Sequence, residues 1–128
     1  MSRGASEGGA RRSLLLVEDD PANWLTLSAV LEEAGFTVAV AETCAQAARL
    51  LEGQPRYDAV LLDSRLGDGD GRELVPLIRR QVPEAKLVLV SGQKGFWAKT
   101  PVDAVFEKGE PVEELLACLE RLLRREPA

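Results

Sequence analysis

Short, mostly apolar runs alternate along this chain with segments whose apolar residues recur at helical spacing. The runs cover residues 14–17, 36–41, 59–62, 87–90 and 104–107. A run that is apolar throughout is typical of a strand buried on both faces, and parallel strands need a crossover between them, usually a helix. The alternation therefore predicts an α/β fold in which helices cover both faces of a parallel sheet of five strands.

Capping residues predict where several of the helices begin. Asp20 can cap the first helix, and capping-box sequences at 43–46 and 70–73 predict the next two starts. Pro76 is expected to weaken or bend the helix that it lies in. Residues 64–69 read as a flexible polar loop, and the last helix is expected over about 112–125.

The chain of 128 residues is short enough to form one domain. Residues 1–12 are rich in Gly, Ser and Arg and have no apolar signal-peptide core, so we expect a disordered tail before a domain at 13–126. The net charge of −5, with no stripe of Lys or Arg, argues against direct nucleic-acid binding. No apolar run is long enough for membrane insertion.

Cysteine and histidine usage restricts the chemistry further. Cys44 and Cys118 each lie in an apolar helical pattern and are expected to be buried, reduced thiols, as is usual in a cytoplasmic protein. The sequence has no histidine, which excludes Ser-His-Asp and Cys-His nucleophile pairs and histidine zinc ligands.

The strands are followed by residues of complementary chemistry. Ligand sites of open α/β sheets lie outside the carboxyl ends of the strands, and the residues there are Glu18, Asp19, Asp20, Asp63, Ser91 and Lys108. Converging carboxylates repel one another unless a cation lies among them, and Mg²⁺ suits one or two carboxylates with phosphate oxygens. A carboxylate beside Mg²⁺ can also attack a phosphoryl group and form an acyl phosphate.

Three other kinds of site fit the sequence less well. A calcium-binding EF-hand loop that uses Gly71 as its glycine would place Leu66 and Leu77 at ligand positions. The glycines of 67–71 lack the spacing of a phosphate-binding loop and alternate with two acids. Aspartate-based phosphatases have a second Asp two residues after the nucleophile, where this chain has Arg65.

The sequence resembles the receiver domain of two-component response regulators. The matching stretches are LLLVEDDP (14–21), YDAVLLDSRLGDGDGREL (57–74), LVLVSG (87–92) and FEKGEP (106–111). The resemblance implies the flavodoxin-like receiver fold, a doubly wound sheet with strand order 2-1-3-4-5.

The resemblance also implies roles for single residues. Asp63 corresponds to the phosphoacceptor, and Glu18 and Asp19 correspond to the acid pair that binds Mg²⁺ together with Asp63 and the backbone carbonyl of Arg65. Ser91 and Lys108 correspond to the residues that contact the phosphoryl group.

In the family, the side chains at the positions of Arg65 and Gln93 adjust the lifetime of the acyl phosphate. Arg65 could shield the acyl phosphate from water or pair with Asp68, and the sequence does not choose between them.

This chain departs from the family pattern at several positions. Glycine stands at 67 and 109, where proline is usual, and is expected to loosen both loops. Val105 stands where many members have a switch aromatic. Only 16 residues separate Ser91 from Lys108, so the fourth helix must be short or irregular.

Phe96 and Trp97 lie in this shortened stretch. They either cover core that the missing turns leave bare or form, with Val105, an exposed surface for a partner.

The expected function is that of a single-domain response regulator, not an enzyme with independent turnover. A histidine kinase or histidine phosphotransfer protein would phosphorylate Asp63, and the response would pass to a downstream protein target, because the sequence up to Ala128 contains no recognisable output domain. The alternative is a phosphorylation-independent interaction module. It is supported by the short fourth helix, Val105 and the two glycines.

Overall fold

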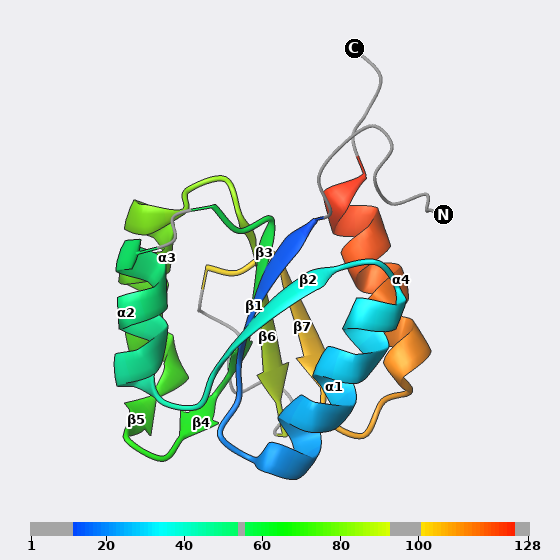
Figure 1. Cartoon of the computed structure of the whole chain (residues 1–128), viewed down its shortest axis with the longest axis horizontal. Helices are drawn as coiled ribbons and strands as arrows, with labels where there is room; N and C mark the ends of the chain where they lie inside the picture. The colour runs from blue at the N-terminus through cyan, green and yellow to red at the C-terminus, as the bar shows by residue number, and fades with distance from the viewer. Residues whose placement is uncertain (1–11, 54–55, 93–100, 125–128) are drawn as a thin grey trace.

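The computed structural model describes residues 12–53, 56–92 and 101–124. At its centre is a parallel sheet with strand order β2-β1-β3-β6-β7 (Figure 1). Its strands are β1 (Ser13–Val17), β2 (Thr37–Ala41), β3 (Ala59–Asp63), β6 (Lys86–Ser91) and β7 (Ala104–Glu107). Numbered among themselves, these strands follow the order 2-1-3-4-5, so the predicted topology is confirmed.

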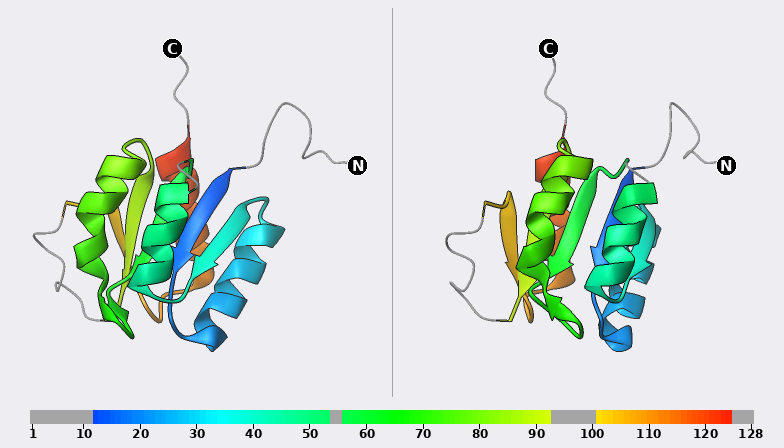
Figure 2. Two further views of the ribbon diagram at one scale, coloured as in Figure 1. Left: turned by 60° about the vertical axis from the view of Figure 1, so that its left-hand side comes forward. Right: turned by 90° about the vertical axis from the view of Figure 1, so that its left-hand side faces the viewer.

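Four α-helices in the described part of the chain cover the two faces of the sheet. They are α1 (Pro21–Glu33), α2 (Cys44–Gly53), α3 (Val75–Gln81) and α4 (Val112–Leu123). Helices α2 and α3 pack on one face and α1 and α4 on the other (Figures 1 and 2). Helix α4 is the predicted last helix. The predicted short fourth helix lies mainly in 93–100, outside the described residues, as do residues 1–11 of the predicted tail.

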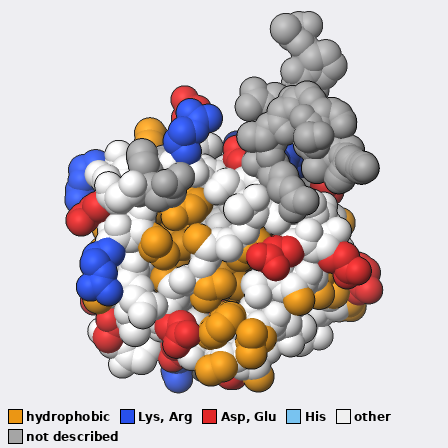
Figure 3. Space-filling view, viewed as in Figure 1, with side chains coloured by type: hydrophobic (Ala, Val, Ile, Leu, Met, Phe, Trp, Pro, Cys, Tyr) orange, Lys and Arg blue, Asp and Glu red, His pale blue; other side chains and the backbone are white. Residues whose placement is uncertain are grey.

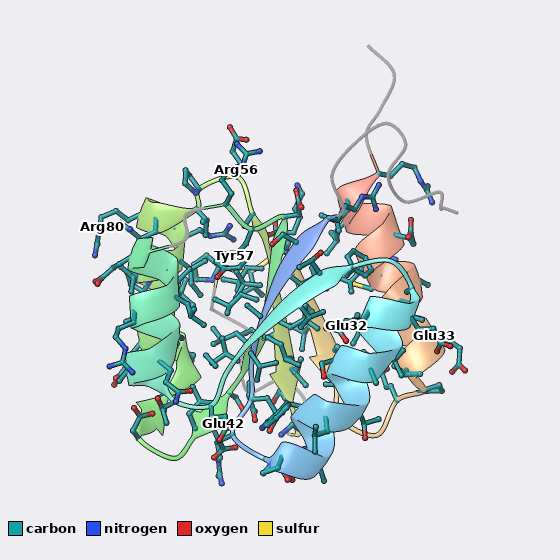
Figure 4. The ribbon with its side chains drawn as sticks, in the orientation of Figure 1. Glu32, Glu33, Glu42, Arg56, Tyr57 and Arg80 are labelled. Carbon is teal, nitrogen blue, oxygen red and sulfur yellow. The ribbon has the colours of Figure 1, made fainter. Side chains whose placement is uncertain are left out.

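Each face of the sheet has its own hydrophobic core. On the α2/α3 side, the odd-numbered Leu15 and Val17 of β1 are fully buried with Leu51 of α2. On the α1/α4 side, the alternate residues of β1 pack with residues of α1 and α4. In Figure 4, Tyr57 lies between the sheet and α2/α3, whereas Arg80 of α3 projects outward. Burial on both faces explains why the central strands β1, β3 and β6 are almost wholly apolar, whereas the edge strands β2 and β7 are only partly buried.

The ends of α1 follow from the residues that cap it. The Asp20 side chain accepts a hydrogen bond from the Ala22 N–H at 3.1 Å, as the sequence predicted. At the other end Gly35 has φ +106°, which a glycine adopts without strain. The N–H groups of Gly35 and Phe36 donate to the carbonyls of Glu32 and Leu31, which closes the helix in a Schellman motif.

The sequence predicts that Pro76 weakens or bends its helix, and the structure places Pro76 just after a change from 3₁₀ to α-helical geometry. A 3₁₀ turn, η1 (Gly71–Leu74), precedes α3, so Pro76 falls in the first turn of the α-helix. A first-turn residue has no intrahelical partner for its N–H, so proline is accommodated there without breaking the helix.

The segment after Asp63 is more ordered than the expected polar loop. Strands β4 (Arg65–Leu66) and β5 (Gly69–Asp70) pair as a small antiparallel hairpin. The Leu66 side chain is buried in the core on the α2/α3 side, which anchors the hairpin to the domain.

The surface retains some apolar side chains. Figure 3 shows hydrophobic side chains over the β2 edge of the sheet, between α2 and α1. Among large hydrophobic residues in the described part, Leu25 and Val105 are the exposed ones. Cys44 and Cys118 are free, as predicted, but only half-buried rather than buried. None of the described helices combines the length and the apolar character that a membrane span requires.

Candidate functional site

The carboxyl ends of β1, β3, β6 and β7 meet at one edge of the sheet, the lower edge in Figure 1. The ladder of β3 with β6 pairs Asp63 with Val90, the residue before Ser91. Ser91 in turn pairs with Glu107, and its carbonyl accepts from the Lys108 N–H at 2.9 Å. The parallel register thus brings together Asp63 and Lys108, which are 45 positions apart in the sequence.

Three carboxylates form a cluster at this edge. Glu18, Asp19 and Asp63 each offer an oxygen, and these oxygens lie within 4.8 Å of one another. Glu18 and Asp63 are buried, whereas Asp19 is exposed. Hard oxygen donors in a shallow, partly open arrangement are suited to Mg²⁺, which keeps several of its waters. The donor set therefore fits the metal that the sequence predicts.

The ammonium group of Lys108 lies against the buried acids. Its Nζ is 3.1 Å from Asp63 Oδ2 and 3.9 Å from Glu18 Oε1. The lysine is the second residue of a tight turn in which the Glu110 N–H donates to the Glu107 carbonyl at 3.1 Å. Gly109, the third residue of this turn, has φ +100°. That combination is the geometry of a type II turn, in which glycine is favoured at this position.

The electrostatics of Glu18 follow from its surroundings. The pKa of Glu18 is raised to about 7, chiefly because the carboxyl is buried, and the Asp63 carboxylate acts in the same direction. The Asp20 N–H, which donates to Glu18 Oε2 at 3.1 Å, and the Lys108 cation act in the opposite direction. In the absence of a metal the cluster therefore disfavours full ionisation of this acid.

The backbone around Asp63 is held closely. Its Oδ1 accepts from the Arg65 N–H at 3.2 Å. Behind it, the Gly71 N–H donates to the Ser64 carbonyl at 3.0 Å, and a Cβ at position 71 would collide with the Asp63 carbonyl oxygen. Gly71 is thus a support that the sequence reasoning missed. The Asp-Gly pair at the start of the helix was the available signal, but it was read only as a cap.

A second missed residue is Asp68. Its carboxylate accepts hydrogen bonds from the N–H groups of Cys44 at 2.7 Å and Ala45 at 3.2 Å, at the start of α2. Asp68 forms no ion pair with Arg65 in the part of the chain that the structure describes. The pKa of the Cys44 thiol is raised to about 11, chiefly by burial and also by the nearby Asp68 charge.

The remaining predicted positions are placed as follows. Ser91 is buried at the end of β6, beside the acid cluster in the sheet register. Val105 is on the edge strand β7 with 48% of its surface exposed, apart from the cluster. Gln93, Phe96 and Trp97 lie outside the described residues.

The buried acids, the hydroxyl and the lysine thus lie outside the carboxyl ends of a doubly wound parallel sheet, which is where α/β domains of this class bind their ligands. The model of the response regulator receiver domain matches residues 14–109. The chain belongs to this family. Members of the family are modules of two-component signalling rather than independent enzymes, and they act with histidine kinases or phosphotransfer proteins.

Among curated proteins, the photosynthetic apparatus regulatory protein RegA of Rhodobacter capsulatus is 39% identical over 88 residues, which are 68% of this chain and 47% of that protein. The acid tolerance regulatory protein ActR of Sinorhizobium medicae is 34% identical over 97 residues, 76% of this chain and 48% of that one. The chain thus spans less than half the length of these relatives.

A solved structure with similar architecture is the receiver domain of a sensor histidine kinase from Pseudomonas aeruginosa PAO1, which has a magnesium ion in its active-site cleft. It is 28% identical with a TM-score of 0.81, and the match covers 91% of this chain and 100% of that one.

Proposed function

We propose that this chain accepts a phosphoryl group on Asp63 from a phosphohistidine of a partner kinase or phosphotransfer protein, and that the phosphorylated form signals through protein–protein contacts. The single observation that carries the proposal is the Lys108 ammonium 3.1 Å from Asp63 Oδ2, beside three clustered carboxylates. A lysine and an acid cluster at the end of a sheet are the parts that phosphoryl transfer requires.

In the proposed reaction, a carboxylate oxygen of Asp63 attacks phosphorus. The bond between phosphorus and the donor imidazole breaks, and the imidazole leaves with the electron pair of that bond. Charge develops on the phosphoryl oxygens, and Lys108 is close enough to Asp63 to pair with them. The Ser91 hydroxyl donates a hydrogen bond to one of these oxygens. The donor brings the histidine that this sequence lacks.

Glu18, Asp19, Asp63 and the carbonyl of Arg65 would hold Mg²⁺. When bound, the ion neutralises the carboxylates and the phosphoryl oxygens, which otherwise repel one another. Asp19, the exposed member of the cluster, is the ligand that incoming ions meet first.

Arg65 projects from the exposed side of β4, where its guanidinium can shield the acyl phosphate from water, and Gln93 would also tune its lifetime. Val105, with Phe96 and Trp97, would contribute to the surface that a partner reads. A cytoplasmic location and the domain limits 13–126 remain predictions.

The test is phosphorylation with acetyl phosphate and Mg²⁺, followed by intact-protein mass spectrometry. We expect the gain of one phosphoryl group in the wild type and none in Asp63→Asn. A matched control is Asp58→Asn, at the opposite end of β3, where the carboxylate accepts from the Ser13 N–H.

Asp58→Asn should be phosphorylated like the wild type. No mass gain in the wild type, or an equal gain in Asp63→Asn, would refute the proposal and leave the phosphorylation-independent interaction module as the better description.

A further inference from the structure

The tip of the β4–β5 hairpin is tied to a different element of the fold. Gly67 and Asp68 form its two-residue turn, since Leu66 pairs with Gly69. The Asp68 carboxylate reaches the first amides of α2, with Oδ1 at 2.7 Å from the Cys44 N–H and Oδ2 at 3.2 Å from the Ala45 N–H. These amides have no partner within the helix, and a carboxylate also suits the positive end of the helix dipole.

The two hydrogen bonds from the Cys44 and Ala45 amides to Asp68 form a tie between the hairpin and α2. The hairpin needs this tie because its own turn is unfavourable. Two-residue hairpin turns that match the twist of the strands have positive φ at one or both central residues. Positive φ occurs at Gly35 and Gly109 in the described residues, and neither Gly67 nor Asp68 has it. With only two residues in each strand, the hairpin also has few ladder hydrogen bonds of its own.

The hairpin connects the two ends of the acid cluster. At its base, the Arg65 N–H donates to Asp63 Oδ1 at 3.2 Å. At its tip, a Cβ at Gly67 would lie 3.7 Å from Asp19 Oδ2, so the backbone of the turn passes close to the exposed acid. A movement of the hairpin would therefore change the surroundings of Asp63 and Asp19 together.

We propose that Asp68 is a positioning residue for the metal site: its bonds to the Cys44 and Ala45 amides fix the hairpin so that the Arg65 backbone and the Gly67 turn keep their places beside Asp63 and Asp19. This inference rests on the proposed function, because it concerns how well the same acids hold Mg²⁺. Asp68 acts through the hairpin and does not contact the ion.

Removal of the tie should weaken Mg²⁺ binding more than it slows the chemical step. A hairpin without its tip contact samples other positions, so ion binding must first restore the arrangement, and the apparent affinity falls by the fraction of molecules in the competent state. Once Mg²⁺ is bound, the same arrangement is restored. The phosphorylation rate at saturating Mg²⁺ should then stay close to that of the wild type.

The first experiment measures the rate of Asp63 phosphorylation by acetyl phosphate as a function of Mg²⁺ concentration. In Asp68→Ala the half-saturating concentration should rise about tenfold, the lower end of what loss of a supporting contact costs a metal site. Asp68→Asn keeps one acceptor oxygen and should give a smaller rise.

Thr43→Ala is the matched control. The Thr43 hydroxyl caps the same helix by accepting from the Gln46 N–H at 3.0 Å, and within the described part of the chain it has no hydrogen bond to the hairpin. This variant should keep the wild-type Mg²⁺ dependence although it also destabilises α2. An equal shift in Thr43→Ala and Asp68→Ala would overturn the inference, as would an unchanged Mg²⁺ dependence in Asp68→Ala.

The second experiment uses the wild-type protein, so it does not depend on how a variant folds. If the tie strengthens Mg²⁺ binding, then Mg²⁺ must strengthen the tie by the same factor. Hydrogen exchange of the Cys44 and Ala45 amides should slow in saturating Mg²⁺, relative to the Gln46 amide. Unchanged exchange at these two amides would contradict the coupling.

Failure of the proposed function gives a different result from failure of this inference. If the wild type neither binds Mg²⁺ in calorimetry nor gains a phosphoryl group, the proposed function and this inference are both refuted. If the wild type binds Mg²⁺ and is phosphorylated, and Asp68→Ala behaves in the same way, only the role of Asp68 is refuted.

Discussion

Single residues in this site are selected by backbone geometry as much as by chemistry. Gly109 follows Lys108 with φ +100°, where the family usually has proline. Proline has φ fixed near −65° and cannot adopt this conformation. The two residues are therefore alternative ways to turn the chain after the lysine. Glycine in place of proline at 109 therefore changes the kind of turn that follows Lys108. The expected loosening of this loop remains a prediction.

Gly109→Ala should lower the free energy of unfolding by about 1–2 kcal/mol, because a side chain strains a positive φ. Urea denaturation measures this loss. The control is Gly53→Ala at the end of α2, where φ is not positive and an added Cβ meets no atom within 4 Å. That variant should be as stable as the wild type or slightly more so. Equal stability of the two variants would contradict the role assigned to the Gly109 turn.

At the scale of elements, the Asp68 carboxylate joins the start of α2 to the β4–β5 hairpin. The N–H groups of Cys44 and Ala45 hold the pKa of Asp68 below its ordinary range. A lowered folded-state pKa means that this carboxylate stabilises the fold fully above its unfolded pKa, near 3.9. The contribution is lost as the pH falls through the lower folded-state value.

The difference in unfolding free energy between the wild type and Asp68→Asn should therefore be largest near neutral pH and shrink below about pH 4. Urea titrations at a series of pH values measure it. Thr43→Ala removes a cap that does not titrate, so its difference from the wild type should stay nearly constant over the same range. A wild-type advantage over Asp68→Asn that persists in acid would show that the Asp68 charge does not act through the cap.

At the scale of the whole molecule, the acid cluster is a local cost that bound Mg²⁺ would offset. When ionised, buried Glu18 and Asp63 and exposed Asp19 repel one another, and Lys108 balances only part of this charge. Anything that binds the folded state alone stabilises it by mass action. The fold and its site should therefore be most stable with Mg²⁺ present.

Thermal unfolding followed by circular dichroism should show a higher midpoint in Mg²⁺. At a free concentration about ten times the dissociation constant, the gain is roughly 1.4 kcal/mol. Asp19→Asn should reduce this gain while raising the stability of the metal-free protein, since one of the repelling charges is gone. Equal gains in wild type and variant would place Mg²⁺ binding elsewhere.

The sequence alone predicted the parallel sheet and the edge of the sheet where the acids, Ser91 and Lys108 lie, because buried parallel strands are apolar and the loops after them share one edge. The strand order came from the resemblance to the receiver family, since apolar patterning does not fix the order of strands. Local capping likewise determined the start of α1 at Asp20, since that signal is confined to adjacent residues.

Only the tertiary structure decided the features that depend on contacts between distant segments. The bonds from Asp68 to the start of α2 span more than twenty positions of sequence, and the sequence pattern marks Asp68 only as a loop residue. The space that excludes a side chain at Gly71 likewise depends on where β3 ends. Such contacts arise when the chain packs, so no local pattern of residue types records them.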